Sequence, residues 1–485
     1  MTAEHQRLAV NATKEIPLAQ WGPYLSERQW GTVREDYGPW GDAWNYFPFD
    51  HAHSRSYLWG EDGLAGISDF FGNLCFGIAL WNGKDPILKE RLFGLSNPEG
   101  NHGEDVKELY YYLDNLPTHY YMEYLYKYPQ QEYPYEQLRT ENKKRNRLEP
   151  EYEILDTGVF DDNQYFDVLV TYAKQSEQDI FIKIDITNRY TKAAELTVLP
   201  TLWFYNRESY KSYKKMPVIE YIDKGTVRAG HEKMGDYYFY FQPADDCLFT
   251  DNKTNTEKLF GQPNTDIFVK DAFHDAIISK KNIKELSKRK SGTKFSPVYK
   301  MKISGGATKT IYCRLSKDHL DIPFSPSLKN VFDIRKQEAD DFYAAILPKG
   351  MSEDMARIQR QALAGVLWSK QFYHFDVERW LSKGDGITAP NDGKRNGRNH
   401  DWKHLKNQDI ILMPDKWEYP WYAAWDLAFQ CISMAVVDPT FAKHQLLLMM
   451  REWYMKPDGQ LPSYEWNFSD VNPPVQAWAA MQVYN

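Results

Sequence analysis

The chain has 485 residues and a mass of 57.0 kDa, enough for about three domains with large cores. Its 59 Lys and Arg against 67 Asp and Glu give a net charge of −8. This charge argues against a dedicated binder of nucleic acid or of anionic membranes, because both need a positive field. Tyr, Trp and Phe make up 15% of the residues, which suits a large aromatic core or a surface that stacks on carbohydrate.

Cysteine usage and the N-terminal sequence bear on the compartment. Cys75, Cys247, Cys313 and Cys431 lie far apart with no CxxC spacing, so we expect buried free thiols and neither a zinc nor a redox site. The N-terminal residues contain no apolar signal core, and no stretch of about 20 apolar residues occurs. The sequence therefore predicts a cytoplasmic protein that does not act at a membrane.

Residues 1–150 are rich in Trp, Tyr, Gly and Pro and show little periodicity, so we expect ordered loops and short strands. The charged run Glu141–Arg147 is typical of a surface connection. Five segments between residues 150 and 320 are β-branched, aromatic or alternating, which predicts an antiparallel sandwich. They are Tyr165–Tyr172, Asp179–Ile186, Glu195–Tyr205, Tyr237–Phe241 and Thr308–Leu315. The basic segment Lys280–Lys294 is best explained as a solvated excursion, since no aromatic platform accompanies it.

The pattern changes to helices after a charged helical linker at 327–350. Apolar residues at steps of three and four predict a helix over Ser352–Phe372, with Ser352 as its N-cap. The segment Trp421–Val437 is almost wholly apolar, as expected of a helix buried on all sides. Asp438 and Pro439 then supply an N-cap and a first-turn proline for a helix extending through Phe441–Met455, and another helix begins near Pro473.

Strands followed by helices predict an α+β multidomain chain. We expect a β-sandwich domain with aromatic loops at 1–326, the linker at 327–350, and a helical domain at 351–485. The last helix has no glycine cap or polar tail before Asn485, so the sequence suggests a C-terminally truncated protein.

Asp426 is the strongest single candidate for chemistry. It is the only charged side chain between Trp421 and Val437, and burying a carboxylate is costly. A structural explanation would be that Asp426 is the N-cap of a helix that begins later than Trp421, or that it forms a buried salt bridge. A carboxyl with a raised pKa in an aromatic pocket, suited to general-acid work, would explain it functionally.

Two dense loops flank this helix. Met413–Trp421 mixes Asp415 and Glu418 with Trp417, Tyr419 and Trp421, which predicts either a ligand site or a loop held by its own rings. In the loop Gly459–Pro474, Glu465, Trp466, Asn467 and Asp470 offer groups that bind hydroxyls or act as a base. For Asp470 and Asn472, capping of the helix near Pro473 is the better explanation.

Other motifs fall short of their usual patterns. His400 and His404 have metal-ligand spacing only on a helix, and the polar sequence before them favours a loop. Asp251–Asn255 is not a calcium loop, because Lys253 replaces a ligand. No Walker A, GxGxxG, GxSxG or HExxH motif occurs, so ATP, nicotinamide and hydrolase-elbow chemistry lack support.

Several long blocks resemble glycoside hydrolase family 63, in particular its glucosidase-like or mannosylglycerate-hydrolase-like subgroup. They are QALAGVLWSKQFYHFDVERW, NHDWKHL and MPDKWEYPWYAAWDLAF within residues 361–429, LKERLFGL from Leu88, NHGEDVKE from Asn101, and YEWNFSDVNPPV from Tyr464. The resemblance covers nearly the whole chain. It implies an N-terminal β-sandwich followed by an (α/α)6 barrel, here incomplete, and inverting hydrolysis of α-glycosidic bonds without a cofactor or metal.

The resemblance also implies site roles. The aspartate of the aromatic-Ala-Trp-Asp segment is the family's general acid, which maps onto Asp426. Beside this implied role, we expect Trp417, Tyr419, Trp421 and Trp425 to shape the sugar subsite and Glu465 with Trp466 to hold the sugar. The family's general base is a Glu late in the barrel, for which the chain has no match, so we place the base beyond residue 485. Glu465 is also the one attractive substitute for the base within the chain.

Two other classes of function stay open at this point. The first is a carbohydrate-binding protein without turnover. The second is an interaction module whose unfinished barrel packs on another chain. The sugar, the linkage and the oligomeric state do not follow from the sequence.

Overall fold

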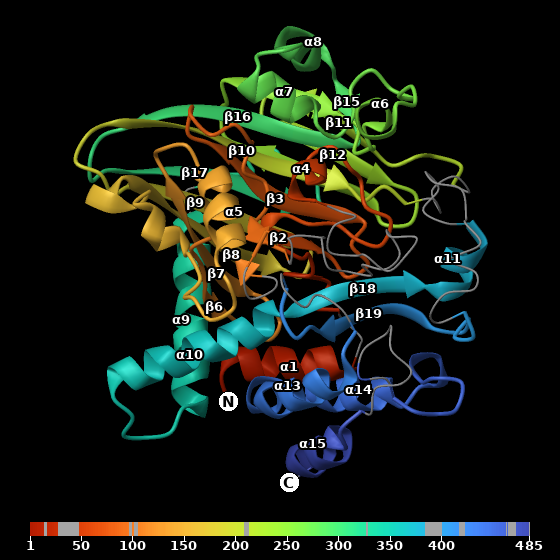
Figure 1. Cartoon of the computed structure of the whole chain (residues 1–485). Coiled ribbons are helices and arrows are strands. Elements are labelled where there is room, and N and C mark those ends of the chain that lie inside the picture. The colour runs from red at the N-terminus through yellow and green to blue at the C-terminus, as the bar shows by residue number, and fades with distance from the viewer. Residues whose placement is uncertain are drawn as a thin grey trace.

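The computed structural model describes residues 1–13, 17–27, 48–96, 99–100, 105–207, 213–325, 328–383, 400–416, 422–461, 463 and 472–484. These residues form a mixed α/β structure. Sheets stack in a sandwich-like arrangement through the N-terminal two thirds, and helices dominate after residue 328 (Figure 1).

The larger sheet of the described residues has nine strands, and each neighbouring pair is antiparallel. In spatial order they are β15 (Ser291–Gly292), β11 (Val218–Asp223), β12 (Thr226–His231), β13 (Gly235–Phe241), β17 (Thr308–Ser316), β9 (Asp179–Asn188), β8 (Tyr165–Ser176), β7 (Tyr121–Pro129) and β6 (Tyr110–Asn115).

The smaller sheet has six strands within the same described ranges, also antiparallel. They are β1 (Trp21–Gly22), β2 (Leu64–Asp69), β3 (Leu74–Trp81), β10 (Ala194–Phe204), β16 (Lys294–Ile303) and β14 (Asp246–Thr250). A short pair, β4 (Gly94–Leu95) and β5 (Asp105–Val106), lies outside both sheets.

The core lies between the two sheets. Strand β9 illustrates how the sequence produces it, since Ile182, Ile184 and Ile186 alternate with the polar residues Lys183 and Asp185 and are all buried. Across the interface, Phe76 of β3 meets Tyr172 of β8 and Phe239 of β13, with ring centroids 6.2 and 5.8 Å apart. Such aromatic contacts add specific geometry to the burial of apolar area.

Helices and short 3-10 turns make up most of the remaining elements. The α-helices are α1 (Ala3–Thr13), α4 (Phe49–Ala52), α5 (Tyr135–Lys144), α6 (Thr256–Phe260), α7 (Ala272–Ile278), α8 (Ile283–Lys288), α9 (Leu328–Ile346), α10 (Glu353–Trp368), α11 (Val377–Lys383), α13 (Ala424–Val437), α14 (Pro439–Met449) and α15 (Val475–Tyr484). The 3-10 turns are η1 (Ile154–Thr157), η2 (Asp161–Asn163) and η4 (Glu452–Tyr454). Strands β18 (Lys370–Asp376) and β19 (Lys406–Leu412) form an antiparallel pair.

Several predicted elements are confirmed. The five predicted strands correspond to β8, β9, β10, β13 and β17. The helix expected within 327–350 is α9, whose Phe332 packs on Phe181 of β9 with ring centroids 6.3 Å apart. The basic segment at 280–294 carries the short helix α8 and leads into β16. The four cysteines are free, as predicted, and Cys75, Cys313 and Cys431 are buried. Cys247 was expected to be buried but is only partly so.

Other predictions were wrong in extent. The helix expected through Phe372 ends at Trp368, because residues from Lys370 pair with β19 and the Phe372 N–H donates to the Tyr24 carbonyl at 3.0 Å. The helix expected to reach Met455 ends at Met449 and gives way to η4. The run Glu141–Arg147 is not only a connection, since its first four residues close helix α5.

The helix predicted to be buried on all sides, α13, has an exposed stripe instead. Phe429 and Val436 are 46% and 49% exposed, because the described helices α14 and α15 cover only part of its surface. Among the described helices, none has the length and apolar character needed to cross a membrane.

The helical part is attached to the sandwich through shared buried groups. Arg360 of α10 pairs with Asp114 of β6, with its Nε 3.2 Å from Oδ1, and Trp368 Nε1 donates to the Asp114 carbonyl at 3.1 Å. One buried cluster joins Trp59 and Leu116 to Tyr343, Leu367 and Leu427 of the helices. The sandwich therefore holds α13, and the residue predicted to be catalytic, against a rigid support.

Candidate active site around Asp426

Asp426 lies in the first turn of α13, where the positive end of the helix dipole favours a negative charge. The helix has no side-chain cap at Ala423, so Asp426 is not the N-cap that a structural explanation required. No salt bridge to Asp426 occurs among the described residues. Its carboxyl is half-buried at the start of an apolar helix.

Burial raises the pKa of the Asp426 carboxyl above its usual value, and a hydrogen bond from its own backbone N–H offsets this in part. Desolvation disfavours the charged form, so the carboxyl keeps its proton to a higher pH than an exposed aspartate. A group of this kind is suited to donating a proton.

The start of α13 is fixed by its neighbours. Gln476 of α15 donates through Nε2 to the Ala424 carbonyl at 2.7 Å, and Asn472 donates through Nδ2 to Gln476 Oε1 at 3.1 Å. Gln430 donates to the Met413 carbonyl, at the beginning of the aromatic loop. The first turn of α13, the loop before it and the segment before α15 are thereby tied together.

Trp425, predicted to shape the sugar subsite, lies beside Asp426 in sequence and is half-buried. Its ring packs against a cluster of Ala428, Val475 and Ala479, with the Phe429 ring 6.1 Å away between centroids. Part of its surface therefore serves contact between α13 and α15. The other predicted subsite residues, Trp417, Tyr419, Trp421, Glu465 and Trp466, lie outside the described residues.

Sequence reasoning missed two buried charges next to these segments. Glu27 accepts hydrogen bonds from the Tyr112 and Tyr124 hydroxyls at 3.2 and 3.4 Å, and burial raises its pKa to about 7. Lys416 lies within the loop Met413–Trp421 and donates to the Pro23 carbonyl at 2.5 Å. Burial lowers the pKa of Lys416 to about 8, while the nearby charge of Glu27 acts in the opposite direction. Nothing in the local sequence signals either burial.

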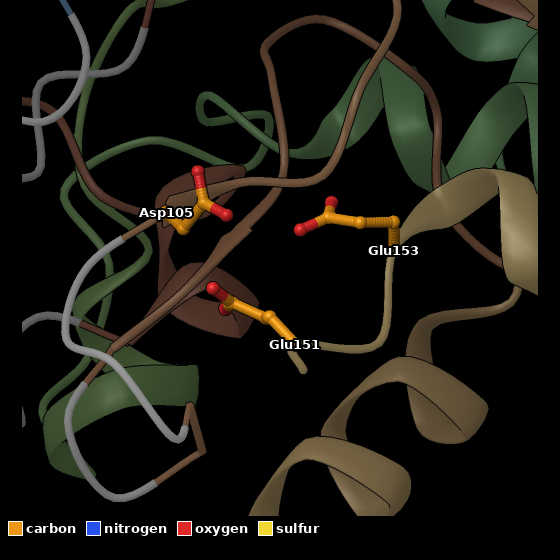
Figure 2. Close-up of side chains that lie close together, drawn as sticks. All are labelled: Asp105, Glu151 and Glu153. Carbon is orange, nitrogen blue, oxygen red and sulfur yellow. The ribbon is translucent and has the colours of Figure 1, made fainter. Parts of the chain in front are cut away.

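A group of three carboxylates elsewhere resembles a cation site. Those of Asp105, Glu151 and Glu153 lie within 4.8 Å of one another (Figure 2). The buried ammonium of Lys107 pairs with all three, at 2.6, 2.9 and 3.0 Å. Glu153 also caps the turn η1. The lysine thus supplies the positive charge that this acidic group needs, so the group is best explained as structural.

The sandwich encloses a small charged cavity. It is lined by Glu61, Asp62, Glu90, Arg91, Lys270 and Lys294, together with Trp203 and Asn252. Asp62 pairs with Arg91 at 2.9 Å, and Glu90 pairs with Lys294 at 3.3 Å. Its volume of about 20 Å³ has room for about one water molecule and none for a sugar.

A larger pocket of about 300 Å³ lies where α1, α9 and the junction of α13 and α14 meet. Its polar groups are already engaged. His5 bonds to the Thr2 hydroxyl at 2.7 Å, and Asp438 caps α14 by accepting from the Phe441 N–H at 2.9 Å. The pocket therefore lacks the free convergent polar groups of a sugar site.

The two histidines with metal-ligand spacing do not converge. His404 Nε2 contacts the Met455 carbonyl at 2.9 Å, and His400 Nε2 lies 3.2 Å from Asp401. These residues lie in turns, as the sequence predicted.

Comparison with known proteins gives one extensive relative. No family model matches the chain. The uncharacterized protein YMR196W of Saccharomyces cerevisiae is 43% identical over 531 aligned residues, which cover 100% of this chain and 49% of the relative. The chain thus spans about half the length of this curated relative.

Three solved structures with some likeness are named as enzymes that act on carbohydrates. A polysaccharide lyase has 10% identity and a TM-score of 0.24, covering 53% of this chain and 27% of its own. A protein assigned as a kojibiose phosphorylase from the human microbiome has 9% identity and a TM-score of 0.24, and the match covers 87% of this chain and 52% of that protein. The family 92 α-mannosidase BT3965 of Bacteroides thetaiotaomicron has 9% identity and a TM-score of 0.15, and the match covers 62% of this chain and 36% of that protein. Scores this low do not establish a common fold.

Proposed function

We propose that this chain carries the acid half of an inverting glycoside hydrolase, similar to family 63, that cleaves α-glycosidic bonds of a glucoside, a mannoside or a small conjugate. The observation that carries the proposal is the half-buried carboxyl of Asp426, raised in pKa at the start of an apolar helix. The long sequence blocks similar to family 63 support it. Because no family model matches, membership in that family is itself part of the proposal.

In the proposed reaction, Asp426 protonates the glycosidic oxygen as the bond to the anomeric carbon breaks. A glutamate outside residues 1–485 takes a proton from the water that attacks the opposite face. Inversion needs these two carboxyl groups roughly 6.5–9.5 Å apart, which leaves room for that water. No metal or organic cofactor takes part.

The remaining assignments follow the same proposal. Trp417, Tyr419, Trp421 and Trp425 form the walls of the sugar subsite, and Glu465 with Trp466 holds the sugar by hydrogen bonds and stacking. Helices from α10 onward form the first part of an (α/α)6 barrel. The substrate is a soluble carbohydrate met in the cytoplasm.

The second candidate is a carbohydrate-binding or interaction protein on the same scaffold. The exposed apolar side chains of α13 and α15 favour it, because they offer an area for contact that catalysis does not use.

An activity screen separates the two candidates. The 485-residue chain and the full product of its gene are assayed on aryl α-glucoside, aryl α-mannoside and mannosylglycerate, with Asp426→Asn as the matched variant. We expect turnover by the full gene product and its loss in the variant. Saturable sugar binding without turnover by either form would favour the second candidate. Full activity of the 485-residue chain would place the base within it, with Glu465 as the first suspect.

A further inference from the structure

Three neighbouring helices share an apolar face that the described residues leave uncovered. Helix α15 contacts both α13 and α14, and the Phe429 and Trp478 rings of α13 and α15 lie 5.6 Å apart between centroids. We define the α13–α15 face by six side chains that are between 46% and 86% exposed: Phe429, Leu447, Met450, Trp478, Met481 and Tyr484.

The composition of α15 is unlike that of a surface helix. Its sequence, VQAWAAMQVY, has no charged residue, yet only Val475 and Ala479 are buried in its contact with α13. A surface helix normally carries charged and polar residues on the side away from the core, whereas a helix that is apolar all round is buried. Figure 1 places α15 at the margin of the molecule, beneath α13 and far from the sheets.

The apolar face continues from α15 onto α14. Leu446 packs in the same cluster as Val475 and Ala479, so this side of α14 is turned toward α15. Met450 lies one turn beyond Leu446 on that side, and it is exposed. Isolated apolar residues at a surface need no explanation, but a contiguous group over three helices marks a site of contact.

The length of the yeast relative indicates what covers this face. The whole of this chain aligns with 49% of that protein, which therefore contains about as much polypeptide again. We propose that the α13–α15 face is the docking surface for amphipathic helices of the half of the longer protein that this chain does not span. Those helices present apolar side chains to Trp478 and Met481. This inference is independent of the proposed catalysis, since it rests on exposure and on length.

Hydrogen exchange of the intact yeast protein and of this chain, each in its native buffer, tests the proposal. The amides of the yeast segment aligned with α15 should exchange at least about tenfold more slowly than those of α15 in this chain, after correction for intrinsic rates. Helix α5 on the sandwich serves as the internal control and should exchange alike in both. Equal exchange of the α15 segments would overturn the proposal.

Charged substitutions provide a second measurement. In this chain, Trp478→Lys with Met481→Lys should shift the melting temperature by less than ~2 °C, because both side chains are exposed. At the aligned yeast positions the same pair should lower it by more than ~5 °C, since two charges would enter a buried contact. Ile267→Lys, at an exposed apolar position of the sandwich, is the matched control and should have little effect in either protein. A small effect of the pair in both proteins would contradict the proposal.

Sedimentation of this chain tests whether a second copy of it covers the α13–α15 face instead. The proposal predicts that any self-association is weak and that α15 exchanges fast at low concentration. A stable dimer that Trp478→Lys dissociates would show that a second copy covers the face, and the proposal would then be wrong.

Discussion

Asp426 is the residue whose surroundings bear most directly on chemistry. In the folded chain its pKa is raised by burial, so between its ordinary value of 3.8 and that raised value the folded state binds more protons than the unfolded state. The free energy of unfolding therefore falls as the pH rises through this window. Above this window the ionised carboxyl weighs against the folded state, because its burial is not compensated.

Asp426→Asn should consequently leave the free energy of unfolding at pH 7 unchanged or raise it by about 1 kcal/mol. At pH 3.5 the two proteins should unfold alike, because the carboxyl is then mostly neutral. Thermal unfolding at both pH values checks this. A clearly lower melting temperature of the variant at pH 7 would reveal a structural partner for the carboxylate.

His374 gives a second test of burial at this scale. Its ring lies on β18 with the Phe372 and Trp59 rings 6.0 and 5.3 Å away between centroids, and burial lowers its pKa to about 3. Its ordinary pKa is 6.5, so its contribution to stability is complete above 6.5 and is lost as the pH falls toward 3.

His374→Phe should therefore reduce the acid sensitivity of the fold. By pH 4 the parent should have lost at most about 3 kcal/mol more than the variant, relative to pH 7.5. Urea unfolding across this pH range measures the difference. Parallel pH dependences of the two proteins would mean that His374 titrates normally.

Asp426 could be identified from the sequence because it is a charged residue inside an apolar segment. This signal is local and does not depend on residues elsewhere in the chain. Glu27 and Lys416 could not be found in this way. Glu27 contacts Tyr112 and Tyr124, and Lys416 contacts Pro23, all of which are distant in sequence from the charge they contact. A charged residue in a loop is normally exposed.

At the scale of elements, the predictions were correct where apolar residues repeat with the period of a strand or where a capping residue begins a helix. The isoleucines of β9 alternate, and Ser352 and Asp438 both cap the helices that they were predicted to begin. The β18–β19 pair was missed because β18 directly follows α10, and its Phe372 continues the apolar spacing of that helix. Its strand conformation depends on pairing with residues about 35 positions later in the chain.

The N-cap of α10 can be tested separately. The Ser352 hydroxyl accepts a hydrogen bond from the Met355 N–H at 3.3 Å in an exposed position. Ser352→Ala should lower the free energy of unfolding by about 1 kcal/mol, whereas Ser352→Asp should retain it because the carboxylate also accepts from the helix. Urea unfolding of both variants provides the check. Equal stabilities of the two would show that the cap contributes nothing.

At the scale of the molecule, the sandwich and the helices share buried residues, and α13, α14 and α15 carry an apolar face that the described residues leave exposed. The order of strands before helices followed from the sequence, because the period of the apolar pattern changes near residue 350. The number and closure of the helices did not follow, since they depend on contacts that periodicity does not specify. The barrel and the boundaries at 326 and 350 accordingly stay predictions.

The claim that Asp426 is the general acid is tested most directly by leaving-group dependence in the active full-length product. Turnover of α-glycosides with a poor leaving group, such as a simple alcohol, is compared with that of a glycosyl fluoride, for the parent and for Asp426→Asn. Loss of an acid catalyst should slow the poor leaving group about 10²–10⁴-fold, because that oxygen needs a proton, and should slow the fluoride far less. Equal losses on both substrates, or none, would contradict the assignment of Asp426 as the acid.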